Sequence, residues 1–137
     1  MNITEKLNFK TEGYQIVNIT REIQELVNRH SFEKGLVNLS ILHTSASLTI
    51  QENASKEVLS DISAFLNNLA PKTANYLHNV EGADDMPAHL KTLVTNTNLT
   101  LSVVSNKIVL GVWQGIYLCE WRTHAHNRSI IVHLLGE

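Results

Sequence analysis

The order of the hydrophobic patterns along the chain constrains its fold more than any other feature of the sequence. Segments in which apolar and polar residues alternate come in groups, and only three segments have apolar residues at helical spacing. A doubly wound parallel sheet needs a helix after nearly every strand, so this order favours an α+β fold. Because no linker or repeat divides the chain, we expect one domain over residues 1–137. It should be a mainly antiparallel or mixed β-sheet sandwich with two or three helices.

The alternating segments predict the strands. Leu7 and Phe9 precede a Glu12-Gly13 turn, and residues 14–17 follow it, which predicts a β-hairpin. Residues 36–43 predict the next strand, in which Val37, Leu39, Ile41 and His43 share one face and His43 is the last residue. Further strands are expected at 47–51, 99–104, 108–110, 115–121 and 130–135.

Three segments predict helices. The first starts near Thr20 and runs to about His30. The second covers residues 55–69, where an apolar stripe recurs at helical spacing, and a proline stops it at position 71. The third is short and begins around residues 84–87, where an aspartate can cap the helix and a proline is tolerated in the first turn.

Charge and composition exclude several kinds of function. The chain carries 11 basic and 13 acidic side chains, a net charge of −2, so it has no overall attraction for nucleic-acid phosphates or anionic lipids. It has one cysteine, Cys119, and neither an export signal nor a run of ~18 apolar residues. We therefore expect a cytoplasmic protein that binds no nucleic acid and no membrane. Motifs of nucleotide-binding loops and of serine hydrolases are absent.

Seven histidines are many for a chain of this size, and two groups of them are candidates for a site. His43 is followed by small hydroxyl side chains that suit an anion or a metal-bound water, although a structural histidine is the alternative. His78 and His89 enclose Glu81, Asp84 and Asp85, and zinc accepts imidazole together with carboxylate ligands. The competing interpretation is that an aspartate caps the helix and both histidines are incidental, since no short regular spacing links them.

Two further segments carry polar side chains of interest. His124 and His126 would share one face of an extended segment, but the polar run around them is typical of a hairpin loop, so we leave them out of the site. Glycines flank Trp113 and Gln114, which suggests a kink where the backbone approaches another group closely, and Glu120 ends the strand that follows.

Three sequence blocks together resemble the YjbQ-like family. They are HTSAS at residues 43–47, EGADDMPAH at 81–89 and GVWQGIYLCE at 111–120, and the chain closes with Gly136-Glu137. The resemblance covers essentially the whole chain. It implies an α+β fold assembled as a compact homotrimer. It also implies a pocket built from the His-Thr-Ser block, the segment from His78 to His89 and the Trp-Gln-Gly strand.

The resemblance also implies a function. Members of the family have been named secondary thiamine-phosphate synthases, because they weakly join a pyrimidine pyrophosphate to a thiazole phosphate. It implies a bound divalent metal, which is either a zinc-like ion or magnesium. It also implies a small phosphorylated metabolite as ligand. The alternative is a non-catalytic homotrimer that binds a metal or a metabolite. The matching positions are His43, His78 and His89 for the metal, Asp85, Gln114 and Glu120 for catalysis, and Thr44, Ser45 and Trp113 for the substrate.

Overall fold

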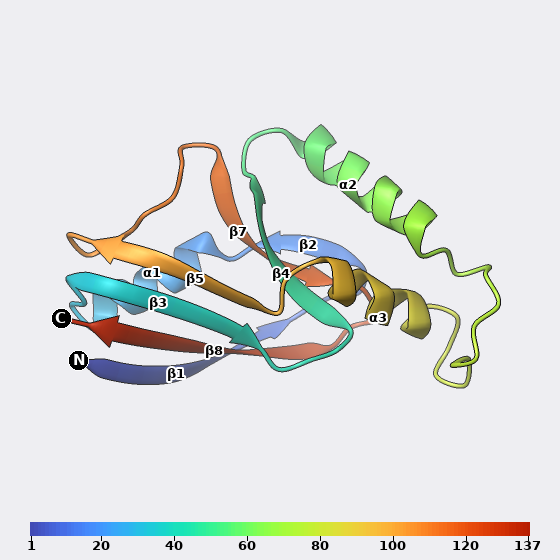
Figure 1. The fold of residues 1–137 in the computed structure, drawn as a ribbon, viewed down its shortest axis with the longest axis horizontal. Helices are drawn as coiled ribbons and strands as arrows, with labels where there is room; N and C mark the ends of the chain where they lie inside the picture. Colours follow the sequence, from blue (N-terminus) through green and yellow to red (C-terminus); the bar gives the residue numbers. More distant parts are fainter.

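A computed structural model describes all residues from Met1 to Glu137 (Figure 1). Its strands and helices follow one another in the order that the hydrophobic patterns predict. The elements are β1 (Asn2–Lys10), β2 (Gln15–Asn18), α1 (Thr20–Arg29), β3 (Lys34–Ile41), β4 (Ala46–Glu52), α2 (Lys56–Leu69), α3 (Asp85–Val94), β5 (Asn98–Val104), β6 (Lys107–Ile108), β7 (Gln114–Glu120) and β8 (Asn127–Gly136).

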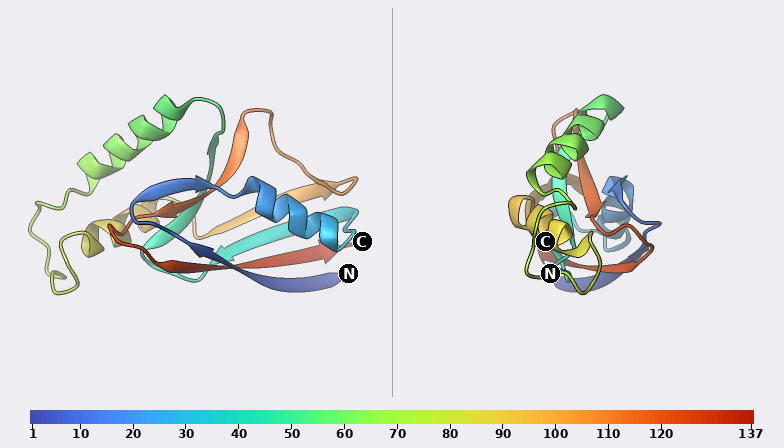
Figure 2. Two further views of the ribbon diagram at one scale, coloured as in Figure 1. Left: turned by 180° about the vertical axis from the view of Figure 1, so that it is seen from behind. Right: turned by 90° about the vertical axis from the view of Figure 1, so that its right-hand side faces the viewer.

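The strands form two sheets. The larger sheet has five strands in the order β1-β8-β3-β5-β6, and the smaller has three in the order β2-β7-β4. Every pairing is antiparallel, which confirms the α+β fold and narrows the expected "antiparallel or mixed" sheets to antiparallel ones. Figures 1 and 2 show the smaller sheet lying across the larger one, with α1 beside it.

The prediction that the first two strands form a hairpin is wrong. β1 pairs with β8 along its whole length, whereas β2 pairs with β7 in the other sheet. The Glu12-Gly13 signal therefore marks a crossing between sheets. Gly13 has a φ of 112°, and a Cβ there would lie 2.7 Å from the carbonyl oxygen of Thr123. The crossing needs this glycine because it passes close to another backbone segment.

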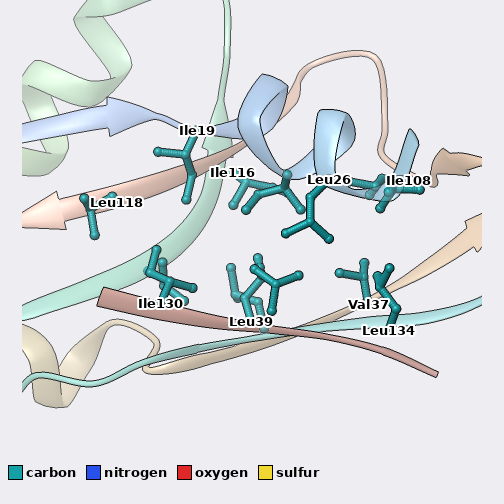
Figure 3. Close-up of a cluster of buried hydrophobic side chains, with 14 of the residues drawn as sticks. Ile19, Leu26, Val37, Leu39, Ile108, Ile116, Leu118, Ile130 and Leu134 are labelled. Atoms are coloured by element: carbon teal, nitrogen blue, oxygen red, sulfur yellow. The ribbon is translucent and has the colours of Figure 1, made fainter. Parts of the chain in front are cut away.

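The main hydrophobic core lies between the five-stranded sheet and the layer made of α1 and the smaller sheet (Figure 3). The strand prediction assigned Val37, Leu39 and Ile41 to one face, and all three are buried. Val37 and Leu39 face Leu26 of α1 and Ile116 of β7 across the core. Cys119 is also buried, and burial raises the pKa of its thiol to about 12, so it is an inert core residue.

The second helix is only partly packed. Leu66 is buried against Trp121 and Cys119, but Phe65 and Leu69 of the same apolar stripe are 64% and 56% exposed. α2 lies at the edge of the molecule, and residues 70–84 lead from it to α3 (Figures 1 and 2). None of the three helices is long and apolar enough to cross a membrane.

Candidate functional site

Three of the predicted site residues converge at the start of α3. Asp85 and His89 are one helical turn apart and therefore lie on one face of α3. His78 reaches the same point from the segment before the helix. Its Nε2 lies 2.6 Å from Asp85 Oδ2, and His89 Nε2 lies 3.1 Å from that same oxygen. The three ligand atoms are all within 4.8 Å of one another, and we call this group the imidazole–carboxylate cluster.

The protein holds the cluster's carboxylate from one side. Asp85 Oδ1 pairs with Arg122 Nη1 at 2.9 Å, which leaves Oδ2 to the imidazoles of His78 and His89. Burial alone would raise the pKa of Asp85. The hydrogen bond with His78, together with the charges of His89 and Arg122, outweighs burial and lowers this pKa. Asp85 is therefore ionised, and its Oδ2, on which both imidazoles converge, is the oxygen that a bound metal would share with them.

A backbone carbonyl orients His89. Its Nδ1 lies 2.9 Å from the carbonyl oxygen of Thr44, in the connection between β3 and β4. A carbonyl oxygen can only accept, so Nδ1 carries a proton and donates it to this bond. Nε2 is then the nitrogen left for Asp85: it donates to Oδ2 while it carries a proton, and it offers a lone pair to a metal when it does not. Histidines that ligate metals in proteins are commonly fixed in this way through their second nitrogen.

Arg122 is the main site residue that sequence reasoning missed. Its guanidinium binds Asp85, donates from Nε to Asp84 Oδ2 at 2.8 Å, and donates from Nη2 to the carbonyl oxygen of Glu81 at 2.9 Å. It lies in the loop after β7, far along the chain from these partners. Its only local signal is a positive charge beside a buried tryptophan, which does not identify its partners.

Asp84, one of the two aspartates that could have capped α3, is at the N-cap position but makes no capping hydrogen bond with its side chain. Its Oδ2 instead accepts hydrogen bonds from Arg122 Nε and from the backbone N–H of Thr123. Burial would raise the pKa of Asp84, but these bonds lower it strongly. The two aspartates and Arg122 thus tie the start of α3 to the β7–β8 loop.

His43 lies outside the cluster. β3 ends at Ile41, so His43 follows the strand that it was expected to end. Its Nε2 accepts a hydrogen bond of 2.8 Å from the backbone N–H of Ser129, so the ring proton is on Nδ1. Burial, followed by the charge of Arg128, lowers the pKa of His43 and favours this neutral form. With one nitrogen accepting and the other protonated, neither is free to bind a metal in this arrangement.

Thr44 and Ser45 lie beside the cluster and contribute through their backbone. The carbonyl oxygen of Thr44 accepts from His89 and from the Thr92 hydroxyl, and that of Ser45 accepts from the backbone N–H of Trp121. Their own hydroxyl groups make no hydrogen bond within the chain and stay available to a ligand.

Trp113 and Gln114 lie far from the cluster within one chain. Gln114 begins β7 and Trp113 directly precedes it, whereas the loop that reaches the cluster follows the end of this strand, roughly 20 Å further on. Gln114 Oε1 accepts from the backbone N–H of Gly111 at 2.7 Å and closes a turn there. Trp113 is 63% exposed.

Glu120 is fully buried, and both of its oxygens are occupied. It forms an ion pair with Arg128, and its Oε1 also accepts a 2.6 Å hydrogen bond from the Thr11 hydroxyl. Oε2 accepts from the backbone N–H of Arg122. Burial would raise the pKa of Glu120, but the bonds from Arg128 and Thr11 lower it. This geometry gives Glu120 a structural role, joining three segments beneath the site.

His124 and His126 lie in the loop between β7 and β8, as the sequence indicates. Their rings stack with centroids 5.8 Å apart, and His126 Nδ1 donates to the carbonyl oxygen of His124 at 2.7 Å. Neither belongs to the imidazole–carboxylate cluster.

The fold and the sequence together define the class of protein. Residues 5–137 match the family described as UPF0047 protein YjbQ-like, and the chain belongs to this family. It is similar to a UPF0047 protein of Synechocystis, with 41% identity over 97% of this chain and 91% of that protein. It is also similar to the UPF0047 protein YjbQ of Escherichia coli O157:H7, with 42% identity over 96% and 94% of the two chains.

Two solved structures share the fold at appreciable identity. An uncharacterised YjbQ/UPF0047 protein of Clostridium acetobutylicum superposes with a TM-score of 0.88 and 30% identity, covering 96% of this chain and 99% of the other. A conserved hypothetical protein of Thermus thermophilus superposes with a TM-score of 0.86 and 34% identity, over the same shares of the two chains. The family resemblance of the sequence blocks is therefore confirmed.

Proposed function

We propose that His78, Asp85 and His89 bind a divalent transition metal and that the protein is a metal-assisted enzyme for a small phosphorylated metabolite. The observation that carries the proposal is the convergence of two imidazole nitrogens on one oxygen of a carboxylate whose other oxygen is held by Arg122. The tautomer of His89 supports it, because the Nδ1 bond to Thr44 leaves Nε2 as the nitrogen that faces Asp85.

The donor set selects among metals. Two nitrogens and one oxygen match the three protein ligands of catalytic zinc sites, which leave a further position for water or substrate. Mg²⁺ prefers carboxylates and water to imidazole, so we propose a zinc-like ion. When bound, such an ion supplies a Lewis acid for a phosphate oxygen and lowers the pKa of a bound water.

The chain's own residues prepare this chemistry. Arg122 keeps Asp85 ionised together with His78 and His89 and fixes its orientation, and the Thr44 carbonyl fixes the ring of His89. The hydroxyls of Thr44 and Ser45 are free to contact an anion beside the cluster. On the His78 side, the cluster borders an open cavity of about 220 Å³, which gives a ligand access.

Thiamine-phosphate synthesis is a secondary activity in this proposal. Release of pyrophosphate usually employs Mg²⁺, and the imidazoles of the cluster suit a different metal. We also place the protein in the cytoplasm, since its single cysteine is a buried thiol that needs no oxidising compartment.

Turnover measurements test the proposal. Chelated protein, reloaded with Zn²⁺, Mn²⁺ or Mg²⁺, is assayed on a panel of phosphorylated heterocycles that includes the pyrimidine and thiazole pair. We expect saturable turnover that a zinc-like ion restores and that His78→Ala removes. His133→Ala is the control, because His133 lies on β8 and contacts Asn2. Metal binding without turnover of any compound in the panel would favour the non-catalytic alternative.

We further propose that the chain assembles as a homotrimer. Phe65, Leu69 and Leu93 are apolar side chains that one chain leaves exposed on α2 and α3, and contact with other copies would cover them. Light scattering at low micromolar concentration should give three times the 15.4 kDa mass of the chain. A mass of one chain at that concentration would refute the trimer.

A further inference from the structure

A second cavity has in its wall Asp84, the residue next to Asp85 of the imidazole–carboxylate cluster. Its volume is about 460 Å³, within the usual range for small-molecule sites. Tyr14 and Trp121 form an aromatic wall, and two prolines add apolar surface. The full lining consists of Tyr14, Asn67, Pro71, Lys72, Thr73, Asp84, Pro87, Lys91, Trp121 and Thr123.

Lys91 supplies a buried positive charge to this cavity. It lies on α3 and is only 4% exposed. Its Nζ donates to Asn67 Oδ1 at 2.7 Å and lies 4.7 Å and 5.5 Å from the ring centroids of Tyr14 and Trp121. An ammonium group has three N–H donors, and one hydrogen-bond acceptor in the chain is within reach. Lys91 has no carboxylate within ion-pair distance, although buried charges are usually paired.

The remaining charges of the lining do not supply that partner. Asp84 is the only acidic residue in the cavity wall, and its Oδ2 already accepts from Arg122 and Thr123. Lys72 adds a second positive charge and forms no ion pair either. The hydroxyls of Thr73 and Thr123 add polar groups to the same wall. The cavity thus combines two unpaired cations with an aromatic surface.

We propose that this cavity binds a small organic anion whose phosphate or carboxylate oxygens accept hydrogen bonds from Lys91 Nζ. The aromatic or apolar body of the ligand packs against Tyr14 and Trp121. Lys72 adds electrostatic attraction at the mouth of the site. None of the three cluster residues lines this cavity, and Lys72 borders both it and the cavity beside His78. The site needs no metal, so it goes beyond the proposed function.

Calorimetric titrations on chelated protein test the charge requirement. The probes are phenyl phosphate, benzoate and benzyl alcohol, which share an aromatic ring and differ in the polar group. The same titrations on His78→Ala separate this site from the metal site, because His78 does not line the cavity. We expect both anions to bind more tightly than the alcohol, with the same affinities in His78→Ala. The ratio of the two anion affinities tells a phosphate site from a carboxylate site.

Lys91→Met removes the charge and keeps an apolar side chain of similar length. It should weaken binding of the preferred anion by about tenfold to a hundredfold, the usual effect of losing a charged hydrogen bond. Lys107→Met is the control, because Lys107 is exposed on β6, outside the cavity. Unchanged binding in Lys91→Met would overturn the proposal. If Lys91→Met does not fold, the titrations of the three probes into wild-type protein test the proposal instead. Benzyl alcohol that binds as tightly as both anions would overturn the proposal.

Discussion

Replacing His89 by alanine should abolish metal binding and leave the fold intact. His89 is about one-third exposed, so its removal opens no sealed cavity in the hydrophobic core. Its Nε2 is one of three ligand atoms, and losing one of three typically costs most of the affinity of such a site. Metal content and melting temperature, measured on one preparation of His89→Ala, check both parts of this prediction.

The opposite pattern, lower stability with the metal retained, would identify His89 as a packed helix residue. In that case the variant would lose about 1–3 kcal/mol of stability and keep its metal. His43→Ala is the matched comparison, because His43 is a histidine beside the cluster whose Nε2 is already bonded to the backbone of Ser129. We expect His43→Ala to retain the metal, although the sequence blocks place His43 among the ligands.

Replacing Glu120 by glutamine should destabilise the protein by about 3–5 kcal/mol, the usual cost of breaking a buried ion pair from one side. Glu120 is completely buried, and its charge is matched by Arg128, which is itself buried. The neutral amide leaves the Arg128 charge without its partner, and in either orientation its NH2 group faces one of the Arg128 donors. Urea unfolding measures the loss, with the exposed Glu12→Gln as control.

The stability that Glu120→Gln loses relative to wild type should decrease as the pH falls. The folded-state pKa of Glu120 is lowered, so its ionised form stabilises the native state above the ordinary glutamate pKa of about 4.3. That contribution is lost as the pH falls from this value through the lowered pKa. The stability difference between wild type and Glu120→Gln should therefore shrink in acid. A difference below about 1 kcal/mol at neutral pH would contradict the structural role of Glu120.

The order of elements and the buried strand faces could be predicted because both depend on local periodicity. Val37, Leu39 and Ile41 alternate with the polar Asn38 and Ser40, and this local alternation indicates their buried face. The pairing of strands is not local. Nothing near Glu12 and Gly13 shows that the two flanking strands enter different sheets, so the turn signal was misassigned to a hairpin.

The candidate site likewise has one part that follows from local structure and another that depends on long-range packing. Asp85 and His89 are four residues apart on a helix, and His78 is close in sequence, so their proximity follows from local structure. Arg122 reaches them only through the packing of the β7–β8 loop. Trp113 and Gln114 share a sequence block with Glu120, but an extended strand separates its two ends, so the block spans two distant regions.

Elemental analysis of the wild-type protein tests the central claim most directly. The protein is purified without added metal and without a histidine tag, and its metal content is compared with its mass in solution. The proposed cluster of His78, Asp85 and His89 predicts about one zinc-like ion per chain, and less than a tenth of that in Asp85→Ala. Wild-type protein that contains no metal and takes up none when titrated with Zn²⁺ would contradict the account.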